Sequence, residues 1–197
     1  MRYDAEHKQK TRSKVLEVAA QAIRKDGPDR IGVAGVMAEA GLTHGGFYAH
    51  FKSKDELVTA AIGQMFEESR ARFVHEMEGR SPAEGLSAYI DFYLSARHRD
   101  MRGAGCPMAA LASDLPRLPD DARALFAEGA RRLTGALARK FEAMAYADPQ
   151  ALARSTVSEL VGALSLARVE TDTQRSDAIL ADSRRLLKQR LGLEPTA

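Results

Sequence analysis

The sequence predicts an all-α protein of about nine helices, and three observations lead to that prediction. The helix-favouring residues Ala, Leu, Arg and Glu dominate the chain. Runs of β-branched residues are absent, and no alternation of apolar and polar residues lasts long enough for a strand. Breaks, mostly at glycine and proline, leave segments of ordinary helix length, and they fall at residues 27–28, 41, 52–53, 79–82, 103–107, 116–119, 148–149 and 171–173.

Length and composition indicate an ordinary globular protein. The 197 residues can bury one sizeable core or a small domain joined to a larger one, and 45% of them are hydrophobic. No apolar run approaches the roughly 18 residues that a membrane span needs, and the polar residues 1–12 hold no signal-peptide core. The single cysteine, Cys106, excludes an internal disulfide. We expect a cytoplasmic protein that does not enter a membrane.

Positive charge is concentrated in the first quarter of the chain. Residues 1–54 carry ten of the 29 Lys and Arg and six of the 27 Asp and Glu, a balance of +4. The remaining 143 residues carry a balance of −2. This distribution suggests an anionic partner for the first quarter, although an excess of four charges also arises by chance.

The N-terminal part of the chain has the make-up of a small three-helix unit. A helix over about 9–26 places Val15, Leu16, Ala19, Ala22 and Ile23 on one face and Lys10, Arg12 and Lys14 on another. Two short helices follow, which must pack on a longer one. Ser53 and Glu56 then form a capping box that starts the fourth helix. We expect a DNA-binding domain at 1–53 and a larger helical domain at 54–197.

Residues 32–51 predict a helix-turn-helix, and residues 33–51 read VAGVMAEAGLTHGGFYAHF. Gly41 stands where a left-handed residue ends the first helix, and Thr43 is a good N-cap for the second. Phe47 and Phe51 share one face of the second helix, which leaves polar residues on its other sides: Thr43, His44, Gly45, Tyr48 and His50. Gly45 and Gly46 each cost about 1 kcal/mol relative to Ala in a helix. Two such residues in so short a helix suggest that it must approach a surface closely, and the major groove of DNA is such a surface. Each feature has an alternative interpretation when it is taken singly: GLTHGG could be any glycine-rich turn, and Tyr48 could be an aromatic residue of the core.

The segment GLTHGGFYAHFKSKDEL resembles the recognition-helix signature of the TetR family of bacterial transcriptional regulators. The likeness covers the whole chain, and its specific part is residues 10–58. It implies a homodimer that places the third helix of each protomer in the major groove of double-stranded operator DNA. It also implies a helical C-terminal body that binds a small inducer and dimerises through its last two helices, with repression as the usual mode.

The resemblance also implies roles for single residues. Thr43 would contact a phosphate or a base, and His44, Gly45 and Gly46 would face the bases, where sequence is recognised. Tyr48, His50 and Lys54 would contact the DNA backbone, and Lys52 is a further candidate for DNA binding. Many members have Ser or Thr just before the second helix, whereas this chain has Ile31 and Gly32. Any contact there must come from backbone amides at the start of that helix, at Gly32 and Val33.

The C-terminal helices are longer, and we expect them over 120–145, 150–168 and 175–191. The second carries small residues, Ser158, Gly162, Ala163 and Ser165, that allow close approach between helices. The last two helices therefore suit an intersubunit four-helix bundle. They could instead close the core of a single chain, and the resemblance favours the dimer.

An inducer pocket would lie among the central helices. Its expected wall is apolar: Tyr89, Phe92, Tyr93, Cys106, Met108, Leu111, Phe126 and Met144. An apolar wall favours a largely apolar inducer, although such residues at helical spacing are more often plain core. A thiol close to a helix N-terminus and to several arginines is also a candidate electrophile or oxidant sensor. For Cys106 we favour the common alternative, a buried small apolar residue.

Enzyme chemistry has no support in the sequence. The five histidines are scattered, without Cys or Glu partners at metal-ligand spacing. No nucleophile-elbow, dinucleotide or phosphate-loop pattern is present. We therefore expect no enzyme activity, cofactor or metal. The remaining alternatives are a helical small-molecule-binding protein and an architectural helical protein, and both predict no salt-dependent binding to duplex DNA.

Overall fold

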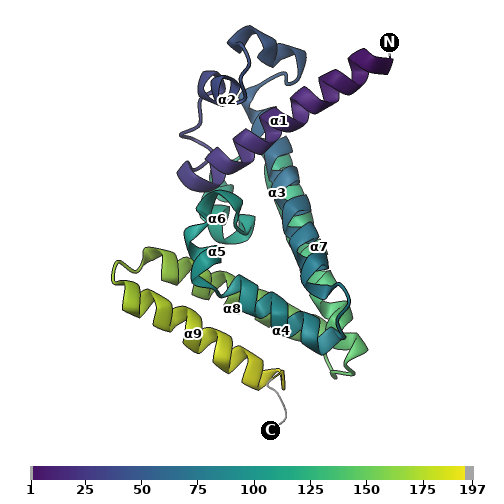
Figure 1. The fold of residues 1–197 in the computed structure, drawn as a ribbon, viewed down its shortest axis with the longest axis vertical. Helices are drawn as coiled ribbons and strands as arrows, with labels where there is room; N and C mark the ends of the chain where they lie inside the picture. The colour runs from purple at the N-terminus through teal and green to yellow at the C-terminus, as the bar shows by residue number, and fades with distance from the viewer. Residues whose placement is uncertain (1, 194–197) are drawn as a thin grey trace. The chain divides into compact units, whose positions relative to one another are not determined.

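The protein is all-α, as the sequence predicts. A computed structural model describes residues 2–193, with the side chains of 2–5 left out, and every regular element in that range is helical (Figure 1). The elements are α1 (Arg2–Asp26), α2 (Val33–Glu39), η1 (His44–Ala49), α3 (Lys54–Met77), α4 (Pro82–Tyr93), α5 (Ala96–Asp100), η2 (Arg102–Ala104), α6 (Pro107–Leu111), η3 (Leu115–Arg117), α7 (Asp120–Ala143), α8 (Pro149–Val169) and α9 (Thr173–Arg190), where η marks a 3-10 helix.

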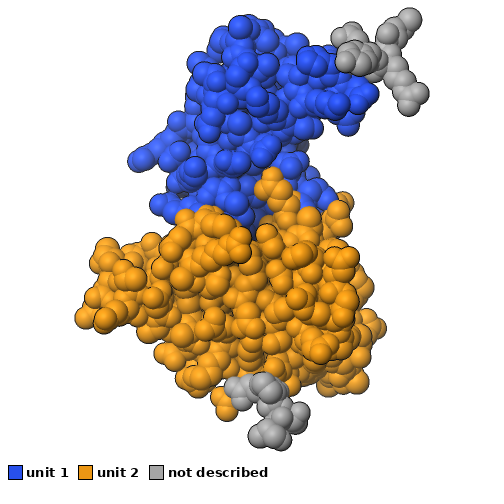
Figure 2. Space-filling model, in the orientation of Figure 1, with its two compact units in different colours: residues 1–67, 102–128 blue, residues 68–101, 129–197 orange. Residues whose placement is uncertain are grey.

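The chain divides into two compact units, coloured blue and orange in Figure 2. The first comprises residues 1–67 and 102–128, and the second comprises 68–101 and 129–197. Helices α3 and α7 each contribute residues to both units. The boundary that we expected after residue 53 falls inside the first unit, and the division into a DNA-binding and a ligand-binding domain stays a prediction.

Helix α1 is longer than its apolar pattern indicates. Four of the five residues of its predicted inner face are buried, with Val15, Ala19 and Ile23 fully covered, and Ala22 is half-buried. It starts at Arg2, however, and not near residue 9. Residues 6–10 are all exposed, so no apolar periodicity marks them as helical. An ion pair between Lys10 and Glu6 at 3.0 Å, one turn apart, stabilises this polar extension.

A buried arginine joins three parts of the first unit. The Arg24 guanidinium is 4% exposed and donates to the carbonyl oxygens of Gly103 at 3.1 Å and Met65 at 3.4 Å. Arg102 donates in turn to the carbonyl oxygen of Lys25. The C-terminal half of α1 is thereby tied to η2 and α3, because buried carbonyl groups need donors.

The second unit is built around an antiparallel pair, α8 and α9, with α4 and α5 packed against them (Figure 1). The sequence showed no break between residues 82 and 103, but the structure has one there, because α4 ends at Tyr93 and α5 begins at Ala96. Ser95 accepts a hydrogen bond from the His98 amide and starts a separate helix, α5. Arg99 of α5 then donates to Ser176 at 2.8 Å and Asp177 at 2.6 Å, at the start of α9.

Candidate DNA-binding surface

The turn between α2 and η1 is set by the left-handed backbone of Gly41. Its φ of 73° is the conformation that favours glycine. The Gly41 amide donates to the Ala38 carbonyl oxygen, and the Leu42 amide donates to that of Met37, both at 2.9 Å. These two bonds form the Schellman motif that ends a helix. Gly41 therefore occupies the position predicted from the sequence.

The second helix of the motif is a 3-10 helix, His44–Ala49, and not the α-helix that we expected. Two successive glycines disfavour α-helix, and 3-10 geometry is common in such short pieces. Thr43 takes the N-cap position with extended backbone, but its hydroxyl makes no capping hydrogen bond. Phe47 and Phe51 are buried, with ring centroids 5.6 Å apart, and they anchor the element as predicted.

The outer side of η1 presents polar and aromatic groups. Tyr48 is 70% exposed, which removes the alternative that it is a core residue. Thr43, His44 and Gly45 are also exposed, and a Cβ added at Gly45 would meet nothing within 4 Å. Gly46 is half-buried, and its added Cβ would lie 3.7 Å from the Met37 side chain. The accessible face of η1 thus comprises Thr43, His44, Gly45 and Tyr48.

The ring of His50 lies where two cations of α1 act on it. Burial lowers the pKa of the His50 imidazole, and the charges of Lys8 and Arg12 lower this pKa further. Nδ1 of this ring is covered and has no hydrogen-bond partner among the described residues. The Arg12 guanidinium lies 4.6 Å from the centroid of the Phe51 ring. Our sequence reasoning placed Arg12 on an open face of α1 and missed Lys8, because it started the helix after residue 8.

The two lysines after η1 differ in their surroundings. Lys52 is exposed, whereas the Lys54 ammonium donates to the Asp29 carbonyl oxygen at 3.0 Å. The expected capping box is only half formed. The Glu56 amide donates to the Ser53 hydroxyl at 3.1 Å, but the Glu56 carboxylate accepts from the Lys52 amide at 2.8 Å. This bond fixes the chain between η1 and α3.

The start of α2 carries only backbone donors. Gly32 is its N-cap residue, with extended backbone and no side-chain cap, and Val33 is the first helical residue. Gly32 is exposed and Val33 half-buried. The amides of this helix start therefore have no side-chain cap, and their contact with DNA stays a prediction.

The residues expected to line an inducer pocket are distributed over the two units. Cys106, Met108, Leu111 and Phe126 belong to the first, and Tyr89, Phe92, Tyr93 and Met144 to the second. Six of the eight are buried, whereas Phe92 and Met144 are half-buried. Phe126 packs edge-on against Phe66 at 5.1 Å, and Tyr89 packs against Phe73 at 5.0 Å. Their role in ligand binding stays a prediction.

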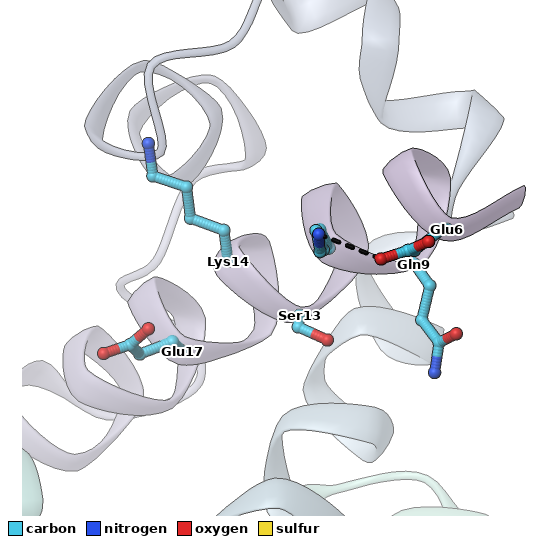
Figure 3. Close-up of a pocket in the computed structure, with 6 residues that line it drawn as sticks. Glu6, Gln9, Ser13, Lys14 and Glu17 are labelled. Carbon is cyan, nitrogen blue, oxygen red and sulfur yellow. Dashed lines mark ion pairs between the residues drawn. The ribbon is translucent and has the colours of Figure 1, made fainter. Parts of the chain in front are cut away.

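The described residues hold neither a candidate metal site nor a membrane-spanning helix. No cluster of three or more His, Cys, Asp or Glu side chains forms a candidate metal site there. Within the same residues, no helix has both the length and the apolar character to cross a membrane. A hollow along α1 is lined by charged and polar side chains, among them those of Glu6, Lys14 and Glu17 (Figure 3).

The fold and the exposed face of η1 define the chain as a helix-turn-helix regulator. Two sequence models match it. Residues 15–61 match the bacterial regulatory proteins of the tetR family, and residues 82–181 match the C-terminal domain of LmrA/YxaF-like transcriptional regulators. The chain belongs to the TetR family.

Curated relatives agree with this assignment. The chain is 37% identical over 67 residues to the regulator TtgR of Pseudomonas putida, covering 34% of this chain and 32% of TtgR. It is 28% identical to YfiR of Bacillus subtilis over 44% of this chain and 42% of YfiR. These two matches span less than half of each relative. A regulator in the lacX 3' region of Lactococcus lactis is 26% identical over 82% of this chain and 85% of its own length.

Solved structures share the fold. A TetR regulator from Chloroflexus aurantiacus superposes with a TM-score of 0.82 at 23% identity, covering 95% of this chain and 96% of that one. The reduced form of NemR from E. coli gives a TM-score of 0.80 at 20% identity, covering 91% and 96%. At such identities the likeness establishes the fold alone.

Proposed function

We propose that this protein is a transcriptional repressor that binds operator DNA as a homodimer, through η1, and leaves it when a small molecule binds. The observation that carries the proposal is the outer face of η1. Phe47 and Phe51 fix the element from inside, so that Tyr48 and its polar neighbours project outward. A short element that exposes these groups beside an open Gly45 suits close contact with the major groove.

The dimer would form through α8 and α9. Leu166 and Val169 of α8 are 64% and 77% exposed, and Leu186 of α9 is 50% exposed. Gly162 precedes Leu166 by one turn, and a Cβ added there would meet nothing within 4 Å. An apolar strip that continues over a glycine allows a second copy to approach closely, which supports an isologous contact of the same face in both subunits.

The signal molecule and the location follow from the same proposal. We expect the inducer to be largely apolar, because the side chains predicted for its site are mainly aromatic and aliphatic. A regulator that meets chromosomal DNA works in the cytoplasm, and we place the protein there. Its action requires no catalytic step.

Capture of genomic DNA tests the proposal. The purified protein is mixed with fragments of its own genome, and the bound fragments are sequenced. We expect enrichment of a few sites with two-fold symmetry, and loss of that enrichment in Tyr48→Ala, whose fold should be intact because Tyr48 is exposed. Enrichment that Tyr48→Ala leaves unchanged contradicts the role of η1. Absence of any enrichment contradicts DNA binding itself.

A further inference from the structure

Two cations of α1 lie beside the end of η1. Lys8 and Arg12 are one helical turn apart, so their side chains share one side of α1. Arg12 stacks on the Phe51 ring at 4.6 Å, and the centroids of the Phe51 and His50 rings are 6.5 Å apart. Both cations act electrostatically on the His50 ring. The three side chains therefore form one group across two elements, α1 and η1.

Among the described residues, the charged donors of this group are not used in ion pairs. Among the side chains that the structure describes, neither Lys8 nor Arg12 has a carboxylate partner or a hydrogen bond to a side chain. Lys8 is exposed and Arg12 is half-buried. Lys10 differs, since its ammonium pairs with Glu6 at 3.0 Å. Two unpaired cations at one place attract an anion, and an oxyanion can accept from both.

His50 is suited to donate a hydrogen bond as a neutral imidazole. Its covered Nδ1 has no partner among the described residues, so a proton on that nitrogen would be a buried donor without an acceptor. The cations that face it from α1 are Lys8 and Arg12, and Lys52 follows on its own segment. Lys8 and Arg12 oppose a further positive charge on the ring. The neutral ring with its proton on Nε2 is the form that these surroundings favour.

We propose that Lys8, Arg12 and His50 form one phosphate-binding site of the DNA surface, in which the two cations supply the charge and neutral His50 donates a hydrogen bond. The inference rests on the proposed function and extends it, because it places α1, outside the helix-turn-helix, in contact with the DNA backbone. Contacts of this kind fix the position of a protein on the duplex and carry no sequence information.

Salt dependence separates the charged from the neutral members of the site. We would measure the anisotropy of a labelled duplex of random sequence and about 30 base pairs, at several salt concentrations between roughly 50 and 200 mM. Lys8→Ala and Arg12→Ala should each reduce the slope of log affinity against log salt by about one unit per protomer bound. Arg12→Lys keeps the charge and should keep the slope, which guards against misfolding of Arg12→Ala.

Variants of His50 test the uncharged donor. His50→Phe removes the donor and should weaken binding by roughly 2- to 12-fold at an unchanged salt slope. His50→Gln, which can still donate, should bind close to the wild type. Between about pH 8 and 7, where an ordinary histidine begins to gain charge, the affinity of the wild type should change no more than that of His50→Gln. A rise in affinity at lower pH that His50→Gln abolishes overturns the neutral donor.

The control is Lys10→Ala, which removes a cation already paired with Glu6 and should leave the slope as it is. An equal loss of slope in Lys10→Ala and Lys8→Ala shows a diffuse charge effect and overturns the site. Wild-type binding that neither Lys8→Ala nor Arg12→Ala alters also overturns it, while the proposed function stands. Failure of the wild type to bind duplex DNA overturns the proposed function and this site together.

Discussion

The Lys54 ammonium donates to the carbonyl oxygen of Asp29 at 3.0 Å, which links the start of α3 to the loop before α2. The sequence suggested that Lys54 contacts a DNA phosphate. One hydrogen of the ammonium group is used within the chain, and two remain for a phosphate oxygen. The same residue can thus hold the helix-turn-helix in place and contact the DNA backbone.

Replacing Lys54 with methionine separates these roles. We expect Lys54→Met to lower the free energy of unfolding by about 0.5–1.5 kcal/mol, the usual net value of one hydrogen bond, and to reduce the salt slope of DNA binding. Urea unfolding measures the first effect and duplex titration the second. An unaltered salt slope in a folded Lys54→Met protein contradicts the phosphate contact. Lys52→Met, at an exposed residue without the bond to Asp29, should leave the unfolding free energy unchanged.

Two glycines of the motif should respond in opposite ways to alanine. Gly41 has a φ of 73°, so Gly41→Ala should lower the free energy of unfolding by roughly 1–2 kcal/mol. Gly45 has an ordinary φ and open space around it, so Gly45→Ala should leave the fold intact and weaken DNA binding by crowding the DNA. Denaturant unfolding and duplex titration of both variants provide the check. DNA binding at wild-type strength in Gly45→Ala would falsify the idea of a close approach there.

Arg24 should be a stability residue. Arg24→Met leaves the Gly103 carbonyl oxygen, now bonded at 3.1 Å, without this donor in a buried position. Such a loss costs about 1–3 kcal/mol, and we expect a lower midpoint of urea unfolding. Lys14→Met, at an exposed position of the same helix, should unfold like the wild type. Equal stability of Arg24→Met and the wild type contradicts a structural role for this guanidinium.

The sequence predicted those parts of the fold that have strong local signals. Gly41 and the pair Phe47 and Phe51 identify the helix-turn-helix. A glycine suited to a left-handed turn and two aromatic residues four positions apart stand together in one short segment. Arg24 could not be predicted in the same way. It looks like an ordinary basic residue in the last turn of a helix, and its burial depends on Gly103, which is distant in sequence.

The helical conformation of the polar start of α1 also could not be predicted from the sequence pattern. Apolar periodicity begins only at Val15 and Leu16, so the pattern contains nothing that would mark Lys8 as helical. Its electrostatic effect on His50 depends on how α1 lies against the residues after η1, where Arg12 stacks on the Phe51 ring. A site that combines residues of two elements becomes visible only when the elements are placed together, and for this reason Lys8 was absent from our sequence-based set.

The dimer can be tested at its most exposed apolar positions. Leu166→Glu places a charge on the α8 strip, and we expect it to convert the dimer to a monomer in sedimentation experiments and to weaken operator binding. The fold of the single chain should persist, because Leu166 is 64% exposed. Val74→Glu, at a residue 50% exposed on α3, is the matched control and should stay dimeric. A dimeric Leu166→Glu protein contradicts an interface centred on this strip.

Burial of Cys106 makes a prediction about its reactivity. The residue is 5% exposed, between the buried residues Gly105 and Pro107. A reagent must wait for local opening before it meets the thiol, so an aromatic disulfide should react with the native protein far more slowly than with the protein in denaturant. Similar rates in both would support the thiol-sensor alternative. In that case Cys106→Ser should also abolish release from DNA by electrophiles. Slow reaction, with release by electrophiles unchanged in Cys106→Ser, leaves the cysteine as a packing residue.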